Sequence, residues 1–298
     1  MEKSVVHSSE QPLSLAVHLH LYYLDMWPDI KKYLQNIGDY PYDLFVTMNS
    51  VDSALVKEIR NFHQQCKIWV VENRGYDVGP FIDFLHKIDL QKYDLVMKIH
   101  TKNNKGPGIG RVNGRLIQRK YWYKLLIEAL IGSTEMFKKN IKEFTKDQYL
   151  GMLGSKYCIT ACPEDSKAIE TDVLKILAEK FSITFVHNII FVAGTMFMVR
   201  ASLLQPIKDN YELEDFEITN GKIKDGTLAH ILERIFGTLT EAKGYKIKGF
   251  DRCFSFMIES FLFKIFRFLY QRKVTHQGYL LIKICKIPVY HQKIIKGK

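Results

Sequence analysis

The stretch VVENRGYDVGPFIDFL, residues 70–85, joins two kinds of secondary structure in one tight corner. The apolar run at 68–71 that leads into it is typical of a β-strand. The segment 80–85 is typical of the start of a helix, with Pro80 in its first turn. Between the two lie Asn73, Arg74, Gly75, Asp77 and Gly79. Backbone amides at a glycine-rich turn and at a helix N-terminus attract anions, so the corner is a candidate anion site.

Two interpretations of this corner remain open from the stretch alone. In the first, Arg74 donates a forked pair of hydrogen bonds to a phosphate, and Asp77 accepts from a ribose hydroxyl or a base N–H. In the second, the corner is an ordinary turn in which Asp77 caps the following helix and Arg74 is solvated.

The first hundred residues alternate between strand and helix patterns. We expect strands at 15–22, 42–48, 67–71 and 93–100, and helices at 26–37, 52–62 (capped by Asp52 or Ser53) and 80–88. Strands separated by helices of about ten residues are typical of βαβ units. The sequence therefore predicts an α/β fold with a Rossmann-type mixed, mostly parallel sheet flanked by helices. The strand C-termini should share one edge, where α/β proteins bind ligands.

The second half of the chain is expected to continue this pattern. A loop is expected at 103–115, and helices are expected at 116–131, 134–145 and 165–181. Strands are expected at 150–157 and 191–199. A further helix should begin beside Asp225, run from Gly226 to Phe236 and end at Gly237.

The strand after the corner carries a row of cations. In YDLVMKIHTKNNK, residues 93–105, Lys98, His100 and Lys102 alternate, so their side chains should point to one face of the sheet. They also lie at the edge where the corner is expected. An edge strand guarded by charge is the alternative, but the apolar run before Lys98 is typical of a buried strand. The row and the corner together predict a diphosphate-binding site.

Four blocks carry a resemblance to a known family: NRGYDVGPF, YDLVMKIHTKNNK, FVAGTMFMVRASLLQPI and DGTLAHILERIFG. In this order they resemble the rhamnan synthesis protein F family, bacterial proteins of rhamnan and O-antigen assembly, over about residues 13–240. That family is similar to GT-A glycosyltransferases, which use nucleotide-diphosphate sugars. Residues 1–12 are polar and are expected to form a flexible tail. The resemblance implies a GT-A-like domain at 13–249. Its nucleotide-binding half would be 13–105 and its acceptor half 106–249.

The resemblance also implies roles for single residues. His20 and Tyr22 would hold the nucleobase, and Asn73, Arg74 and Asp77 would contact base and ribose. Lys98, His100 and Lys102 stand where the family of folds usually has a D-x-D metal motif. Because lysines can neutralise a diphosphate directly, we predict transfer without a metal; Mg²⁺ or Mn²⁺ is not favoured. Gly194 and Thr195 would line the donor site, although a plain core strand is the alternative there.

A catalytic carboxylate is implied near the start of the helix in DGTLAHILERIFG. Displacement at an anomeric carbon needs a base that takes the proton of the acceptor hydroxyl. Asp225 is the first candidate, although the same position also suits a helix N-cap. Glu217 and Glu233 are the other candidates; Glu233 with Arg234 could equally be a structural pair.

The positive charge is concentrated at the C-terminal end. The formal net charge is +11, and residues 252–298 contain ten Lys or Arg and a single acid, Glu259. FSFMIESFLFKIFRFLYQRK, residues 254–273, is predicted to form an amphipathic helix that is too short and too charged to span a bilayer. We expect residues 250–298 to bind an anionic membrane surface. The alternative is a helix packed on the preceding domain with solvated lysines.

These observations favour a glycosyltransferase that moves rhamnose or another hexose from a dTDP-, GDP- or UDP-sugar to a lipid-linked glycan. Other polysaccharide assembly enzymes are possible partners. A non-catalytic nucleotide-sugar-fold subunit of an assembly complex is the alternative. No nucleic acid is expected, because the body of the chain has no basic stripe. The five cysteines are scattered and no secretion signal is seen, so a cytoplasmic place at the inner face of the membrane is expected.

Overall fold

The computed structural model describes residues 11–102, 109–112, 115–161, 167–184, 186–219, 226–250, 258, 261–262, 265–266, 268–274 and 279–293. The chain divides into two compact units. The first comprises Met1–Asn104 and Tyr123–Asp251, and the second comprises Lys105–Trp122 and Arg252–Lys298.

The first unit is built on a seven-stranded sheet with the order β11-β7-β10-β4-β1-β2-β3. Its strands are β1 (Leu15–His20), β2 (Asp43–Met48), β3 (Lys67–Val70), β4 (Leu95–His100), β7 (Leu150–Ser155), β10 (Phe197–Arg200) and β11 (Lys246–Phe250). All neighbours run parallel except β10, which is antiparallel to both β4 and β7. The predicted mixed, mostly parallel sheet is therefore confirmed.

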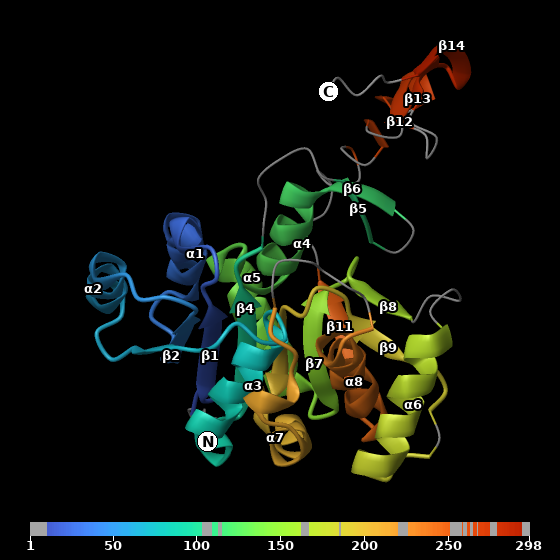
Figure 1. The fold of residues 1–298 in the computed structure, drawn as a ribbon. Coiled ribbons are helices and arrows are strands. Elements are labelled where there is room, and N and C mark those ends of the chain that lie inside the picture. Colours follow the sequence, from blue (N-terminus) through green and yellow to red (C-terminus); the bar gives the residue numbers. More distant parts are fainter. Residues whose placement is uncertain are drawn as a thin grey trace, which may run out of the picture. The chain divides into compact units, whose positions relative to one another are not determined.

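Helices cover both faces of this sheet (Figure 1). They are α1 (Trp27–Leu34), α2 (Ser53–Phe62), α3 (Val78–Lys87), α4 (Arg119–Ile131), α5 (Thr134–Lys146), α6 (Lys167–Phe181), α7 (Gln205–Asn210) and α8 (Leu228–Ala242). Short 3-10 helices lie at Leu24–Met26, Gln35–Ile37, Leu90–Lys92, Ala201–Leu204 and Leu213–Asp215. Phe197 of β10 contacts Phe81 of α3 and Phe236 of α8, whereas Arg200 bonds to the Phe144 carbonyl of α5. Because alternate strand residues face opposite ways, α3 and α8 cover one face and α5 the other.

Capping explains where two of these helices begin. The Asp52 carboxylate accepts from the Leu55 amide at 3.0 Å, which confirms the predicted cap of α2. Ser133 accepts from the Met136 amide in the same way and begins α5. Asp77 stands at the N-cap position of α3, but its side chain makes no capping bond. The cap interpretation of Asp77 is therefore wrong, because its carboxylate has stronger partners elsewhere.

Two sequence predictions for residues 106–249 need correction. The expected strand 191–199 is two strands, β9 (Ile190–Val192) and β10, because a turn at Gly194 and Thr195 separates them. β9 pairs instead with β8 (Ile159–Ala161). The helix expected to end at Gly237 continues to Ala242. A Cβ at Gly237 would overlap the backbone of β9, so this glycine allows close packing and does not end the helix.

The second unit contains less helix than expected. A hairpin of β5 (Ile109–Val112) and β6 (Arg115–Gln118) lies in the predicted loop 103–115 and in the first three residues of the predicted helix 116–131. That helix therefore begins later than predicted, at Arg119 of α4. The described residues among 258–269 are helical. The helix predicted to reach 273 gives way at Tyr270 to an antiparallel sheet of β12 (Tyr270–Val274), β13 (Tyr279–Ile284) and β14 (Ile287–Lys293). Within the described part of the chain, no helix has the length and hydrophobicity needed to span a membrane.

Candidate functional site

Two neighbouring parallel strands place four basic side chains on one buried face. In the register of β1 with β4, His18 pairs with Lys98 and His20 pairs with His100. All four side chains are buried, and the His18 ring stacks on Phe84 of α3 with centroids 4.6 Å apart. The prediction that Lys98 and His100 share a face is confirmed, because both point toward the corner at Asp77.

The ammonium of Lys98 is paired inside the protein. Its Nζ donates to the Asp77 carboxylate, to the Thr195 carbonyl at 3.0 Å and to the Thr195 hydroxyl at 3.1 Å. The Lys98 side chain is 1% exposed and Asp77 is 18% exposed. Burial opposes the charge on Asp77, but nearby His100, Lys98 and Lys102 hold its pKa well below the usual range. The predicted ligand contacts of Lys98 and Asp77 stay predictions; in this structure the two side chains bind each other.

His100 lies between the corner and the turn at Gly194. Its Nε2 is 2.9 Å from the Gly194 carbonyl oxygen and 3.5 Å from the Asp77 carboxylate, and its Nδ1 is 3.0 Å from the Thr101 carbonyl. Burial lowers the pKa of His100 to about 4, so the ring is neutral near pH 7. A neutral ring has one N–H, so it can donate to only one of these two carbonyls.

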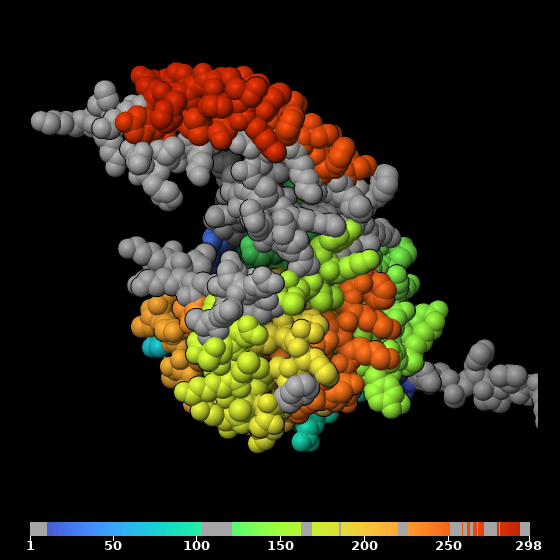
Figure 2. Space-filling model, turned by 90° about the vertical axis from the view of Figure 1, so that its right-hand side faces the viewer, coloured from blue at the N-terminus to red at the C-terminus, as the bar shows by residue number. Residues whose placement is uncertain are grey.

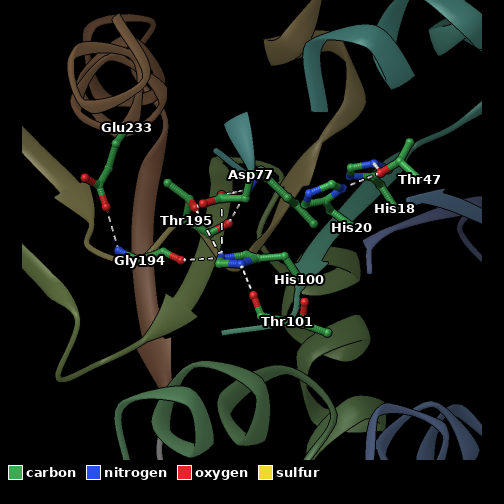
Figure 3. Close-up of polar contacts among 10 residues, drawn as sticks. His18, His20, Thr47, Asp77, His100, Thr101, Gly194, Thr195 and Glu233 are labelled. Atoms are coloured by element: carbon green, nitrogen blue, oxygen red, sulfur yellow. Dashed lines mark hydrogen bonds and ion pairs between the residues drawn. The ribbon is translucent and has the colours of Figure 1, made fainter. Parts of the chain in front are cut away.

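The turn at Gly194 and Thr195 connects this cluster to α8 (Figure 3). Both residues have positive φ, +92° for Gly194 and +51° for Thr195. The Gly194 amide donates to Glu233 Oε1 at 2.6 Å. The Glu233 side chain is 17% exposed, and burial raises its pKa above the ordinary value, although the Gly194 amide and nearby Lys102 and Arg234 oppose the rise. Glu233 also pairs with Arg234, whose Nη1 lies 3.7 Å from Glu233 Oε2, so the structural pair considered in the sequence is present. A partly exposed carboxylate of raised pKa, held by a backbone bond and this ion pair, still suits acid–base chemistry.

Thr47 and His18 are parts of the site that the sequence did not single out. The Thr47 hydroxyl lies 3.0 Å from both His18 Nε2 and His20 Nδ1. A hydroxyl has one proton, so it donates to one ring and accepts from the other. Burial lowers the pKa of His20 to about 3, and both rings stay neutral. The alternation of His18 and His20 was the available signal; Thr47 gave none, because it comes from a different strand.

Asn73 and Arg74 fix the corner to the segment 216–219. The Asn73 amide donates to the Thr219 carbonyl at 2.9 Å, and Arg74 Nη1 donates to the Phe216 carbonyl at 3.0 Å. Arg74 also pairs with Glu72 at 2.6 Å. The interpretation with a solvated Arg74 is therefore wrong. The predicted contact of Asn73 and Arg74 with a nucleotide stays a prediction.

Gly75 gives a direct test of this corner. Its φ is +59°, and a Cβ there would overlap the Phe216 ring. We expect Gly75→Ala to lower the free energy of unfolding by about 2–4 kcal/mol, through backbone strain and overpacking together. Gly244→Ala is the matched control, because φ is +82° there and no atom lies within 4 Å of the added Cβ. Urea denaturation of both variants measures the difference; equal losses would show that the contact with Phe216 is unimportant.

Two other predicted site residues, Tyr22 and Glu217, have no hydrogen bond to the Asp77–Lys98–His100 cluster among the described contacts. The ring of Tyr22 lies 6.4 Å from that of His20 and is 43% exposed. Glu217 is exposed, and its backbone carbonyl accepts from the Gly75 amide. Asp225 lies outside the described residues. Among the described residues, no group of three or more His, Cys, Asp or Glu side chains is arranged to hold a metal ion.

A curated protein is similar in sequence to this chain over most of the length of the chain. A curated relative, the "Uncharacterized protein WxcX" of Xanthomonas campestris, is 27% identical over 247 residues. This match covers 78% of the present chain but 32% of WxcX, so the chain spans about a third of the length of the curated relatives it matches.

Two solved structures are remotely similar. Staphylococcus aureus TarS 1-349 has 10% identity and a TM-score of 0.39, covering 76% of this chain and 56% of TarS. The mannosyltransferase PcManGT from Pyrobaculum calidifontis, solved with GDP-Man and Mn²⁺, has 13% identity and a TM-score of 0.37, covering 80% and 55%.

The family comparison is more extensive than these structural likenesses. The family model described as "Rhamnan synthesis protein F" matches residues 1–245. This range includes all strands of the seven-stranded sheet except β11, together with the corner at Asp77 and the whole of α8. The chain therefore belongs to the rhamnan synthesis protein F family.

Proposed function

We propose that this chain is a glycosyltransferase that moves a sugar from a nucleotide-diphosphate donor to an acceptor hydroxyl. One observation carries the proposal. The Glu233 carboxylate and the Asp77–Lys98–His100 cluster are both bonded to the same turn, at Gly194 and Thr195, at the C-terminal edge of a mostly parallel sheet. Ligands of α/β proteins bind at that edge.

The chemistry follows from the two parts of this site. The acceptor oxygen forms a bond to the anomeric carbon, the bond from that carbon to the diphosphate breaks, and the acceptor proton must be removed. Glu233 takes that proton in the proposal, because its pKa is raised and its side chain is partly exposed. The leaving diphosphate is negative, and Lys102 supplies positive charge that already acts on both Asp77 and Glu233.

We also propose that transfer proceeds without a metal. A hard divalent cation prefers several carboxylate or carbonyl oxygens. The strand end that would carry acidic ligands has Lys98 and His100, and the carboxylate of the corner, Asp77, is bonded to Lys98. These residues place the ammonium of Lys98, and not a metal cation, beside the Asp77 carboxylate. Chelation should therefore leave activity unchanged.

The donor and acceptor are finer proposals that rest on family membership. A dTDP-, GDP- or UDP-linked rhamnose or other hexose is the proposed donor, and a lipid-linked cell-surface glycan is the proposed acceptor. The family name supports rhamnan synthesis, and PcManGT, which was solved with GDP-Man, is one example of a remotely similar protein with a nucleotide sugar.

A non-catalytic role in a polysaccharide assembly complex is the second candidate. The bonds of Lys98, Asn73 and Arg74 favour it, because in this structure these side chains are bound to protein atoms. A chain of this kind would bind a nucleotide sugar, or a partner, without turnover.

Thermal unfolding with a panel of nucleotide sugars tests the proposal. In EDTA, one donor at about 100 times its dissociation constant should stabilise the fold by about 2.7 kcal/mol and raise the Tm by about 5–10 °C. Release of the nucleoside diphosphate on addition of an acceptor glycan then supports catalysis, and binding without release supports the second candidate. A shift seen only with Mg²⁺ or Mn²⁺ contradicts metal independence, and no shift with any donor contradicts the donor site.

A further inference from the structure

The second unit exposes an apolar helical stripe. The described helical residues among 258–269 recur at the spacing of one helix face. Each is between 40% and 62% exposed: Ile258, Phe261, Leu262, Ile265, Phe266, Phe268 and Leu269. A helix normally buries such a stripe, and a large exposed apolar surface usually marks an interaction site.

The sheet that follows adds a second apolar face. The register pairs Ile284 with Tyr270 and with Ile287, and Ile282 with Tyr290, so these side chains share one side of the sheet. Ile284, Ile287 and Tyr290 are 49%, 65% and 43% exposed. Lys283 stands on the opposite side of β13. Arg272 pairs with Ile282 and so holds a position on the same side as Ile282. This side of the sheet is therefore mainly apolar with one basic position, although the sequence predicted a helix for its first strand.

Contacts within the unit connect the stripe to the sheet. The Cys285 amide donates to the Leu269 carbonyl at 3.0 Å, and the rings of Phe266 and Tyr270 lie 6.1 Å apart. Lys286 Nζ lies 5.5 Å from the centroid of Phe268, which places a cation beside the apolar stripe. In Figure 2 the described residues of 258–293 are drawn in orange to red, with many of their atoms turned to the viewer.

We propose that this surface, the apolar stripe of 258–269 together with the apolar side of β12–β14, docks on an anionic lipid bilayer. Charge identifies the partner: residues 252–298 contain ten Lys or Arg and one acid. Exposed aromatic and aliphatic side chains enter the boundary of the acyl chains, while cations contact anionic headgroups. The contact is interfacial. The proposal goes beyond the transferase reaction and does not depend on it.

Sedimentation of the full chain with lipid vesicles tests the proposal. The chain should bind vesicles that contain phosphatidylglycerol more tightly than vesicles of phosphatidylcholine alone. About 1 M NaCl, where the screening length falls to about 3 Å, should remove that preference. The double variant Phe261→Asp/Phe266→Asp should bind at least about a hundredfold more weakly, because two large apolar side chains are lost from the bilayer. Lys286→Gln should weaken binding about fivefold.

Val51→Asp is the matched control, because Val51 is an exposed apolar residue of the first unit, 71% accessible. It should bind vesicles as the wild type does, and all variants should keep the wild-type circular dichroism, since every changed side chain is exposed. Equal binding to both vesicle types, or binding unchanged in Phe261→Asp/Phe266→Asp, would overturn the proposal. So would a wild-type dimer that this variant dissociates and that ignores vesicles, because a second copy of the chain would then cover the surface.

Discussion

Lys98→Met is expected to lower the free energy of unfolding by about 3–5 kcal/mol, because it leaves the Asp77 carboxylate buried without its cation. Lys98 is the fully buried partner of that carboxylate, and Met retains most of its apolar volume. Urea denaturation followed by circular dichroism measures the loss. A variant within about 1 kcal/mol of the wild type would contradict the ion pair, since that is the scale of an exposed pair.

The double variant Asp77→Asn/Lys98→Met provides the control. With both charges removed, no buried charge is left unpaired, and most of the lost stability should return. The pH dependence gives an independent check. Because the pKa of Asp77 is lowered on folding, its contribution to stability is present above the unfolded pKa of about 3.9 and is lost as pH falls further. The double variant should lack that acid-sensitive contribution.

Glu233→Gln is expected to reduce kcat by about 10²–10⁴-fold, the usual contribution of a general base. The glutamine oxygen can still accept from the Gly194 amide, so the affinity for the donor should change little, although the charge of the ion pair with Arg234 is lost. Because burial raises the pKa of Glu233, the wild-type rate should fall as pH drops below that raised value. Steady-state kinetics of nucleoside diphosphate release across pH measure both effects.

Two further variants show whether a loss of activity in Glu233→Gln is specific to the base. Glu58→Gln changes an exposed glutamate of α2 and should retain the wild-type kcat. Asp225→Asn tests the other candidate base, the one first favoured by the sequence. If Asp225→Asn loses the activity while Glu233→Gln stays within tenfold of the wild type, Glu233 holds the Gly194 turn in place and is not the base.

The periodic parts of the fold were predictable because each depends on local pattern. β1, β2, β4 and their helices follow from alternating or helical spacing of apolar residues. The shared face of Lys98 and His100 follows from the two-residue period of a strand. The error at Gly237 arose because glycine ends many helices; only the close approach of β9 shows why α8 continues through it.

The partners within the site were not predictable, because they come from distant parts of the chain. Asp77 bonds to Lys98 and Thr195, and Asn73 and Arg74 bond to residues 216–219. No local pattern indicates that Lys98, a cation predicted to hold phosphate, is paired with the Asp77 carboxylate of the neighbouring corner. The end of the C-terminal helix at Tyr270 was missed for a related reason, since its apolar run fits a helix or a strand equally well.

A crystal structure of the chain with the nucleotide sugar that stabilises it most would show the donor site directly. We expect the diphosphate at the C-terminal edge of the sheet, in contact with Lys102 and the turn at Gly194, and the anomeric carbon facing Glu233. A diphosphate bound away from this edge, or held there by a metal ion with Glu233 turned away from the sugar, would contradict this expectation.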